Sequence, residues 1–356
     1  MYSSAIRRKA TFKPRDGATE LTFAGTGVDD LLRSELHRHA KGEGAKAYRM
    51  LEYFLGFRDE QLSRVAAGRG KRFRSALCLY LADAYGARDS ALGAALSIEL
   101  FHNFTLIHDD IADRDEIRRN KPTLWKLFGV PNALNAGDMQ LILSLEVVLQ
   151  AGNKKDFARI MPVLLRAYRE VCEGQHLDFE LTEKDISKVS EGAYMRMIRK
   201  KAGVLIGVSA ESAGIAAACS KKECSNLREF GCALGTAYQM ADDFRSIWAG
   251  LEKTGKDAHS DIRERKRTLP LILAYQELDS KDKALLANMY KRNRQLSKNE
   301  IRAVLELLEK TFVKHRVLSQ IAAQGKIAKY SLKKLALPEE VKADLTRMLD
   351  VLIIAP

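Results

Sequence analysis

Three aspartates with helical spacing are the residues in this sequence best suited to chemistry. Asp109, Asp110 and Asp113 lie in the segment LIHDDIAD at 106–113. In a helix, Asp109 and Asp113 project from one face, with Asp110 beside them. Three carboxylates this close repel one another unless a cation joins them, and an all-oxygen set favours Mg²⁺, which shares its shell with water and phosphate oxygens. Taken alone, the segment is equally consistent with a solvated acidic helix face.

A second acidic pair and several basic clusters change that balance. Asp242 and Asp243 follow the apolar run AYQMA at 237–241. The basic clusters are GRGKRFR at 68–74, RRNK at 118–121, RKK at 199–201 and RERK at 263–266. Two acidic clusters on separate helices could face each other across the core of a bundle. Carboxylates that hold Mg²⁺ among lysines and arginines would bind a diphosphate and stabilise it as it leaves.

Other chemistries lack their motifs in this sequence. We find neither a Ser/His/Asp nor a Cys/His spacing, and no GxxxxGK[ST] phosphate-binding loop. If diphosphate is the leaving group, the organic fragment becomes a cation and needs a dry apolar pocket. The apolar residues that flank both acidic segments would line such a pocket.

The composition predicts the elements that must position these side chains. Among 356 residues, 46% are hydrophobic and only 7 are proline, and long stretches are rich in Ala, Leu, Glu, Lys and Arg. No alternation of strands and helices is evident, so we predict an all-α fold, a single antiparallel helix bundle. We expect a poorly ordered polar tail over 1–27 and a helical domain over 28–356. Long helices are expected over about 91–111, 157–181 and 227–248, and another is expected to open at Asn135.

Charge and cysteine usage limit the partners and the compartment. The net charge is +13, but no basic stripe with interleaved aromatic residues is present, so nucleic-acid binding is not expected. Phosphorylated small molecules fit the clustered basic residues better. Five cysteines without a CxxC motif indicate a reduced, cytoplasmic protein. We expect no secretory signal and no apolar run of transmembrane length.

In order along the chain, these segments resemble the trans-isoprenyl diphosphate synthases, the polyprenyl synthase family, over about residues 68–270. The matching residues are GKRFR at 70–74, Glu99 with His102, LIHDD at 106–110, Asp113, RR at 118–119 with PT at 122–123, GD at 137–138, GQ at 174–175 with Asp178, Lys201, Gln239 with DD at 242–243, GK at 255–256 with Asp261, Lys266, and TLP at 268–270. The resemblance implies a helix bundle around a deep central cavity, commonly in a homodimer.

The resemblance also implies a role for each matching side chain. Three Mg²⁺ ions would be held on an allylic diphosphate by Asp109, Asp113 and Asp242, with support from Asp110 and Asp243. That diphosphate would be bound by Arg118, Lys201, Lys256 and Lys266. Isopentenyl diphosphate would be bound by Lys71, Arg74, His102 and Arg119. Gln239 would lie near the developing cation, and Gln175 and Asp178 would be hydrogen-bonding partners of metal-bound water.

The implied reaction needs no protein general base. The allylic diphosphate ionises, the isopentenyl double bond attacks the cation, and a proton is lost to the departing diphosphate. Three positions depart from the family pattern: Ser246 stands where most relatives have a third aspartate, Arg245 lies beside it, and Ala202 follows Lys201 where a threonine is usual.

Two residues just before the first acidic segment suggest the product length. Phe104 and Thr105 precede Asp109 by five and four residues, so they would meet the tip of a prenyl tail that grows down the cavity. A ring at 104 with a small residue at 105 resembles geranylgeranyl synthases. We therefore expect a C20 product, with C15 as second choice. The alternative role of Phe104 is core packing.

Two other functions remain open at this stage. A class I terpene cyclase would ionise a prenyl diphosphate on the same bundle but needs no isopentenyl site, whereas Lys71, Arg74, His102 and Arg119 are all present. A non-catalytic regulatory subunit of a heteromeric synthase would be expected to lose carboxylates of the first segment, and these are intact.

Overall fold

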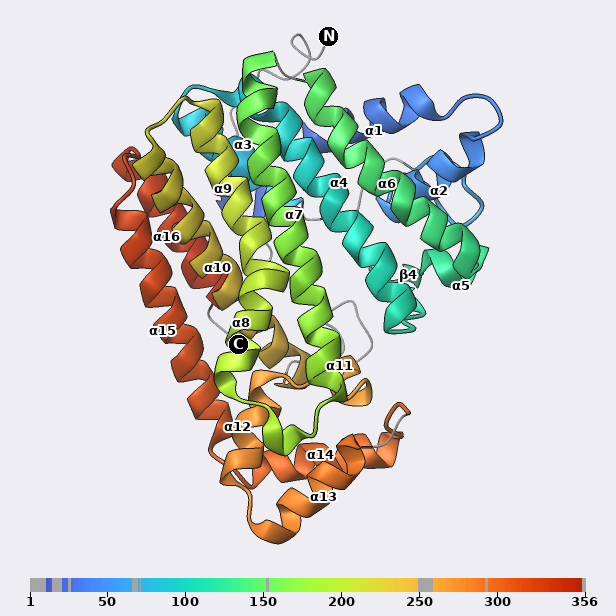
Figure 1. Cartoon of the computed structure of the whole chain (residues 1–356), viewed down its shortest axis with the longest axis vertical. Helices are drawn as coiled ribbons and strands as arrows, with labels where there is room; N and C mark the ends of the chain where they lie inside the picture. The colour runs from blue at the N-terminus through green and yellow to red at the C-terminus, as the bar shows by residue number, and fades with distance from the viewer. Residues whose placement is uncertain are drawn as a thin grey trace. The chain divides into compact units, whose positions relative to one another are not determined.

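Helices make up most of the computed structural model of this protein (Figure 1). The structure describes residues 11–14, 21–24, 27–65, 70, 72–151, 154–248, 259–291 and 294–353. Within those residues, the only strands form two short antiparallel pairs. The expected all-α fold is therefore confirmed. Two expected ligand-binding residues, Lys71 and Lys256, lie outside the described residues.

The chain divides into two compact units. Unit 1 comprises residues 1–166, 208–228 and 336–344, and unit 2 comprises residues 167–207, 229–335 and 345–356. Four helices contribute residues to both units, namely α7 (Lys154–Glu183), α9 (Val204–Ala216), α10 (Lys221–Trp248) and α16 (Glu339–Ile353). The expectation of one helical domain over 28–356 stays a prediction.

The other elements of unit 1 come from the first part of the chain. They are β1 (Thr11–Pro14), β2 (Leu21–Ala24), α1 (Val28–His39), α2 (Ala45–Phe54), α3 (Phe73–Ala84), α4 (Arg88–Ala112), β3 (Ile117–Arg118), β4 (Lys121–Pro122), α5 (Leu124–Phe128) and α6 (Val130–Ala151). The other elements of unit 2 are η1 (Ile186–Lys188), α8 (Glu191–Ile198), η2 (Arg199–Gly203), α11 (Ser260–Arg263), α12 (Leu269–Glu277), α13 (Ser280–Tyr290), α14 (Lys298–Glu309) and α15 (Val313–Lys333).

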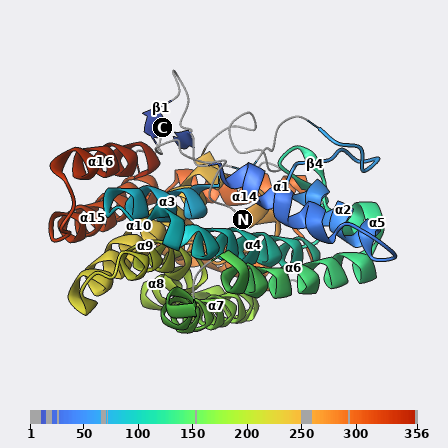
Figure 2. The same cartoon turned by 90° about the horizontal axis from the view of Figure 1, so that it is seen from above.

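Helix α4 is the central element of unit 1. It packs against α3 and α6, and both views show these helices side by side (Figures 1 and 2). Its N-terminal half, Ala91–Phe101, is buried on all sides, as an apolar helix surrounded by neighbours must be. The C-terminal half becomes partly exposed and carries the first acidic segment. A single helix therefore extends from the core of unit 1 to the first acidic segment.

The same helix corrects an expectation about membrane spans. We expected no apolar run of transmembrane length, but α4 has 25 residues and a mean hydropathy of 1.2 over its best window, enough by length and composition alone. In the structure, 78% of that window is buried within the protein. Such burial is typical of a core helix, which meets the same criteria of length and composition.

Unit 2 has a large hydrophobic core of its own. Its members come mainly from α8, η1 and α10–α15, with Leu181 from α7, and its bulkiest fully buried side chains include Tyr194, Phe244 and Tyr290. Helix α12 packs against α8, α14 and α15 in this unit. The core holds the C-terminal part of α10, which carries the second acidic pair.

Two local features differ from the sequence expectations. Within 11–24, β1 and β2 pair with Phe12 opposite Phe23, a strand pair that the sequence reading did not include. Helix α6 begins at Val130, so the expected start at Asn135 is wrong. Pro131 explains the earlier start, because proline suits the first turn of a helix. By contrast, α1 begins at Val28, where the helical domain was expected to start, and carries Asp29 and Asp30 in its first turn.

Candidate active site

The first acidic segment lies at the C-terminal end of α4. Asp113 is the C-terminal capping residue, and its backbone N–H donates to the carbonyl oxygen of Asp109 over 2.8 Å. Asp109 and Asp113 are partly exposed, whereas Asp110 is only 1% exposed. The expected spacing on one helix face is therefore present, with the third carboxylate turned inward.

Asp110 is paired with an arginine of the hairpin that follows α4. Arg118 Nε donates to Asp110 Oδ1 over 2.5 Å, and Arg118 Nη2 lies 3.8 Å from Asp115 Oδ2. Burial lowers the pKa of Arg118, but Asp110 and its neighbouring carboxylates outweigh that effect and raise it. Arg118 is thus a charged residue whose orientation is fixed by Asp110.

The hairpin turn places Arg118 and Arg119 in different environments. Strands β3 and β4 are joined by Arg119 and Asn120, both with left-handed backbone, at φ 53° and 59°. Two consecutive residues of positive φ are typical of a type I′ hairpin turn. The turn directs Arg119 towards α4 at Asn103, whose Oδ1 accepts from Arg119 Nη1 at 3.4 Å and Nη2 at 3.3 Å.

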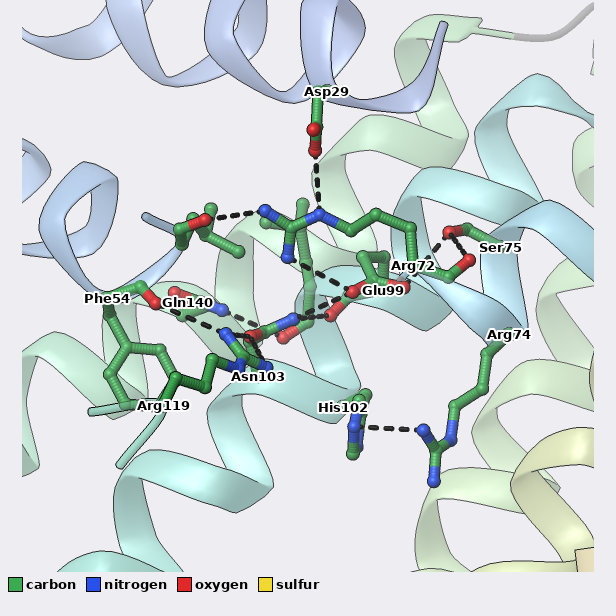
Figure 3. A network of polar contacts seen from close by, with 12 residues as sticks. Asp29, Phe54, Arg72, Arg74, Ser75, Glu99, His102, Asn103, Arg119 and Gln140 are labelled. Atoms are coloured by element: carbon green, nitrogen blue, oxygen red, sulfur yellow. Dashed lines mark hydrogen bonds and ion pairs between the residues drawn. The ribbon is translucent and has the colours of Figure 1, made fainter. Parts of the chain in front are cut away.

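A polar network continues from Asn103 through the interior of unit 1 (Figure 3). Asn103 Nδ2 donates to Glu99 Oε1 over 3.1 Å. Arg72 Nη1 donates to Glu99 Oε1 over 3.3 Å, and Arg72 Nε donates to Asp29 Oδ1 over 2.7 Å. Ser75 Oγ donates to Glu99 Oε2 over 2.9 Å. Helices α1, α3 and α4 are tied together by this network.

Arg74 and His102, two expected isopentenyl diphosphate ligands, are hydrogen-bonded to each other. Arg74 Nη1 donates to His102 Nε2 over 2.9 Å. Burial and the positive charges of Arg74 and Arg119 hold the pKa of His102 well below its usual range. His102 is therefore neutral near pH 7, and its remaining proton is on Nδ1, because Nε2 accepts from arginine. The structure brings Arg74, His102 and Arg119 together beside α4, as expected.

The two residues proposed to limit product length also lie on α4. Phe104 is 9% exposed, and its ring lies 5.5 Å from that of Phe101 and 4.7 Å from that of His108, measured between centroids. Thr105 Oγ1 donates to the His102 carbonyl oxygen over 2.8 Å. The Phe104 ring is therefore buried against two other rings of its own helix.

In unit 2, two lysines converge on one carboxylate. Asp178 Oδ2 accepts from Lys201 Nζ at 2.7 Å and from Lys266 Nζ at 3.4 Å. Burial raises the pKa of Asp178, but the two lysines lower it more, to about 2. Lys201 and Lys266 were expected to bind the allylic diphosphate and Asp178 to contact metal-bound water, and the structure brings the three side chains together. Gln175, one turn earlier on α7, has a buried Nε2 without a hydrogen-bond partner among the described residues.

Lys201 lies in a π-helical segment, η2, which joins α8 to α9. Such segments are rare and often occur at functional sites. Helix α7 approaches this segment closely at Gly174, where an added Cβ would lie 2.3 Å from the Lys201 backbone nitrogen. Only glycine allows this approach. Gly174 thereby lets Asp178 on α7 reach Lys201.

The second acidic pair has one outward and one inward carboxylate. The Asp242 side chain is 54% exposed. Asp243 is 6% exposed, accepts from Tyr194 Oη over 2.7 Å, and accepts from Gln239 Nε2 over 2.8 Å. Burial and the nearby Asp261 carboxylate raise the pKa of Asp243 to about 8. Gln239 and Tyr194 therefore fix Asp243, while Asp242 extends towards solvent.

The departures from the family pattern have structural partners of their own. Ser246 Oγ lies 2.6 Å from Asp261 Oδ2 and 2.8 Å from the Asp243 carbonyl oxygen, so it can donate to either. Arg245 donates to the Leu352 carbonyl oxygen over 3.3 Å and lies 3.5 Å from Asp242 Oδ1. Arg245 thus joins α10 to α16 beside the acidic pair.

The donor set fits Mg²⁺ in its chemistry. Asp109, Asp113 and Asp242 offer carboxylate oxygens, the ligands that this ion prefers. Within the described ranges, no group of three His, Cys, Asp or Glu residues lies close enough to hold a metal ion unaided. Water and phosphate oxygens would therefore complete the shell, as is usual for Mg²⁺. Because Asp109 belongs to unit 1 and Asp242 to unit 2, their convergence stays a prediction.

Some site residues were missed by the sequence reading. Arg72 was given no role although it lies within GRGKRFR at 68–74, and Asn103, which follows His102 on α4, was given none either. Tyr194 was not considered as a site residue. A signal existed for Asn103, because it follows Glu99 by four residues and therefore shares its helix face. For Tyr194 no signal existed, because its contact with Asp243 depends on tertiary packing.

Known proteins resemble this chain in both sequence and structure. A sequence profile of the polyprenyl synthetase family matches residues 59–308. The chain is 36% identical over 263 residues to (2E,6E)-farnesyl diphosphate synthase of Mycobacterium tuberculosis H37Rv, which covers 73% of this chain and 72% of that protein. It is 40% identical over 210 residues to geranylgeranyl pyrophosphate synthase of Geoglobus acetivorans, covering 58% of this chain and 65% of that protein. The crystal structure of a polyprenyl synthetase from Streptomyces coelicolor A3(2) matches with a TM-score of 0.82 at 27% identity, covering 92% and 97% of the two chains.

Proposed function

Because the chain belongs to the polyprenyl synthetase family and is therefore a prenyltransferase, we propose that it condenses isopentenyl diphosphate head-to-tail with an allylic prenyl diphosphate. One observation carries this proposal beyond family membership. Arg74, His102 and Arg119, the expected isopentenyl diphosphate ligands, gather beside one stretch of α4. A terpene cyclase has no use for a second diphosphate site, so this cluster favours condensation over cyclisation.

In the proposed mechanism, one set of side chains binds Mg²⁺ and another binds the allylic diphosphate. Mg²⁺, held by Asp109, Asp113 and Asp242, would supply the positive charge that makes diphosphate a good leaving group. Arg118, already aligned by Asp110, would bind the allylic diphosphate from unit 1. In unit 2, Lys201 and Lys266 would bind the same diphosphate. We retain Lys256 in this group.

For isopentenyl diphosphate, the second substrate, neutral His102 would accept a hydrogen bond from Arg74 and so orient that guanidinium towards the diphosphate. Arg119 would supply a second positive charge, and we retain Lys71 in this group. The isopentenyl double bond would attack the allylic carbon as the carbon–oxygen bond to diphosphate breaks. The proton lost from the new chain would pass to the departing diphosphate, so no protein base is required.

We propose geranylgeranyl diphosphate, C20, as the product, with the C15 product as second choice. The similar relatives include farnesyl and geranylgeranyl synthases, so the proposal depends on α4 itself. Phe104, packed between Phe101 and His108, would block further growth of the tail. Thr105, a small neighbour, would leave room for four isoprene units.

Replacing Phe104 tests whether its ring limits the length of the prenyl tail. Phe104→Ala should give products longer than those of the wild type, because the removed ring opens space beneath the tail. Product lengths are read by chromatography after dephosphorylation. Phe230→Ala, which removes a fully buried ring of α10, is the matched control and should leave the length distribution unchanged. Unchanged product length in Phe104→Ala would refute the assignment.

One assay distinguishes the candidate functions. Purified protein is incubated with Mg²⁺, labelled isopentenyl diphosphate and each of the C5, C10 and C15 allylic diphosphates. Incorporation of label that is lost in Asp109→Ala supports the proposed synthase. Hydrocarbon product without incorporated label would indicate a terpene cyclase, and no turnover with any primer would indicate a regulatory subunit.

Two further properties remain proposals. We propose a homodimer because α6 exposes several large apolar side chains. A cytoplasmic location is proposed because all five cysteines are free thiols, namely Cys78, Cys172, Cys219, Cys224 and Cys232. Fractionation of the source cells with the enzyme activity as marker checks the location.

A further inference from the structure

Arg118 and Arg119 are adjacent in sequence but differ in how their charges are compensated. Arg118 forms ion pairs with Asp110 and Asp115. Within the part of the chain that the structure describes, the hydrogen-bond acceptors of Arg119 are neutral oxygens, those of the Asn103 amide and the Phe54 backbone. Among the described residues, no carboxylate lies within ion-pair distance of Arg119. Its positive charge is therefore oriented without being neutralised.

The orientation of the Asn103 amide is dictated by its neighbours. Asn103 is fully buried on α4. Its Nδ2 donates to Glu99 Oε1 over 3.1 Å and to the Glu99 carbonyl oxygen over 2.8 Å, and both of these atoms only accept. The amide oxygen must then point the other way, towards the guanidinium of Arg119 (Figure 3). An amide is the one side chain of this size that donates on one side and accepts on the other.

Glu99 is itself held in place by groups on two other elements. Arg72 lies between Glu99 on α4 and Asp29 on α1, and Ser75 on α3 donates to the second Glu99 oxygen. The Glu99 carboxylate is thus directed at Arg72 and Asn103. Glu99 and Asp110 act on Arg119 only from beyond ion-pair distance. The amide therefore separates the paired Glu99 carboxylate from a guanidinium that no carboxylate of the described residues contacts directly.

Arg119 remains accessible to a ligand on its other side. It lines a recess together with Tyr53, Phe54, Arg118 and Lys121, so the recess wall is basic and partly aromatic. Burial and the charges of Arg72 and Arg118 lower the pKa of Arg119 to about 10. Arg119 is still protonated near pH 7, and those same neighbouring charges make the surroundings favourable for an anion.

We propose that Asn103 is a positioning residue for the reaction: it holds Arg119 through a neutral acceptor, so that the full guanidinium charge stays available to the diphosphate of isopentenyl diphosphate. The inference rests on the proposed function, because it takes Arg119 as a ligand of that substrate. It also explains why position 103 carries asparagine and not aspartate, whose side chain has nearly the same shape. An aspartate would fit the same space but would cancel the charge of Arg119 and face Glu99 with a second anion.

Two substitutions separate position from charge. Asn103→Asp keeps an acceptor for Arg119 and adds a negative charge, whereas Asn103→Leu keeps the volume and removes the acceptor. Each is combined with Arg119→Ala in a double-mutant cycle. Asn288→Asp, on the exposed surface of α13, is the control for the added charge. The readouts are KM for each substrate, kcat, and calorimetric binding of isopentenyl diphosphate to the full chain.

Both Asn103 variants should raise KM for isopentenyl diphosphate and its calorimetric Kd about tenfold or more, because a charge-assisted contact is lost or cancelled. KM for the allylic substrate should change less than twofold, and Asn288→Asp should match the wild type. In the Arg119→Ala background, the Asn103 substitutions should have no further effect on isopentenyl diphosphate binding.

Other results would overturn the inference. If both KM values rise alike, or if the Asn103 and Arg119 effects multiply independently, then Asn103 serves only packing. Should Asn103→Asp fail to fold, Asn103→Leu in the same cycle still decides. If the wild type neither binds nor incorporates isopentenyl diphosphate, the proposed function is wrong. If the wild type is active and the Asn103 variants behave like it, only the role of Asn103 is refuted.

Discussion

Asp178 illustrates how a single side chain in this protein combines stability with a part in the site. Its Oδ2 accepts from both Lys201 and Lys266, and the carboxylate is only 6% exposed. A buried carboxylate is costly unless paired, and here two cations compensate it. The two ion pairs also hold the Lys201 and Lys266 side chains in position.

The lowered pKa of Asp178 gives a signed pH dependence. Because its folded-state pKa of about 2 lies below the unfolded value of about 4, the carboxylate stabilises the fold above pH 4. That contribution is lost as the pH falls from about 4 to 2. Asp178→Asn should therefore lower the free energy of unfolding at pH 7 by about 2 kcal/mol, and the deficit should shrink below pH 4.

Urea unfolding of the wild type and the variant between pH 8 and pH 3 measures this difference. Glu309→Gln, at an exposed position of α14, is the matched control and should show little change at any pH. A deficit that stays constant down to pH 3 would mean that the carboxylate charge does not contribute.

For individual residues, the sequence predicted which side chains lie near the site, but not which of them form hydrogen bonds and ion pairs with one another. The motif resemblance assigned Lys201 and Lys266 to the allylic diphosphate and Asp178 to metal-bound water, and the structure brings the three into contact. It gave no sign that Asp178 is the common acceptor, because pairing between distant segments is set by tertiary packing. Only local pairs, such as Glu99 with Asn103 at i, i+4, were open to prediction.

At the scale of elements, the crossing of α7 and η2 determines where Lys201 lies. The π-helical register of η2 cannot be read from residue types, because RKKAG at 199–203 also suits an ordinary helix. The close approach at Gly174 was visible only as one glycine inside a helical pattern. Helix existence was predicted well and helix starts less well, as α6 shows.

Gly174→Ala tests the importance of this crossing. The new Cβ would meet the Lys201 backbone nitrogen at 2.3 Å, so α7 and η2 must move apart. We expect a loss of about 1–3 kcal/mol in the free energy of unfolding and a higher KM for the allylic substrate. Thermal or urea unfolding and steady-state kinetics measure these effects.

Gly192→Ala is the control for this prediction, because its Cβ would meet only an arginine side-chain atom at 3.5 Å in α8. It should stabilise the protein by up to about 1 kcal/mol through its higher helix propensity. If Gly174→Ala behaves in the same way, the crossing is not tight.

At the scale of the whole molecule, assembly is the main open property. Helix α6 exposes four large apolar side chains, Val130 at 40%, Leu134 at 41%, Ile142 at 56% and Leu149 at 59%. Apolar side chains gathered on one helix are typical of a surface that another protein covers. A second copy of this chain is the proposed partner, because most soluble oligomers are symmetric homodimers.

Sedimentation equilibrium should therefore give a mass of twice 39.9 kDa. The double substitution Ile142→Glu and Leu149→Glu should give a monomer that remains helical by circular dichroism, because the charges would be buried on association. Ile327→Glu, at a 50% exposed position of α15, should leave the dimer intact. A wild-type monomer at micromolar concentration would refute the proposed dimer.

Helix α4 has one more consequence for the proposed chemistry. His102 and Asp109 are seven residues apart, which is close to two helical turns and about 10 Å along the axis, and brings both to nearly the same face. Under the proposed roles, one of these residues belongs to each reactant. The helix geometry then sets the distance between the two substrates, because no loop lies between His102 and Asp109. Under these roles, the spacing of the two substrates is set by a single helix whose N-terminal half is buried in the core of unit 1.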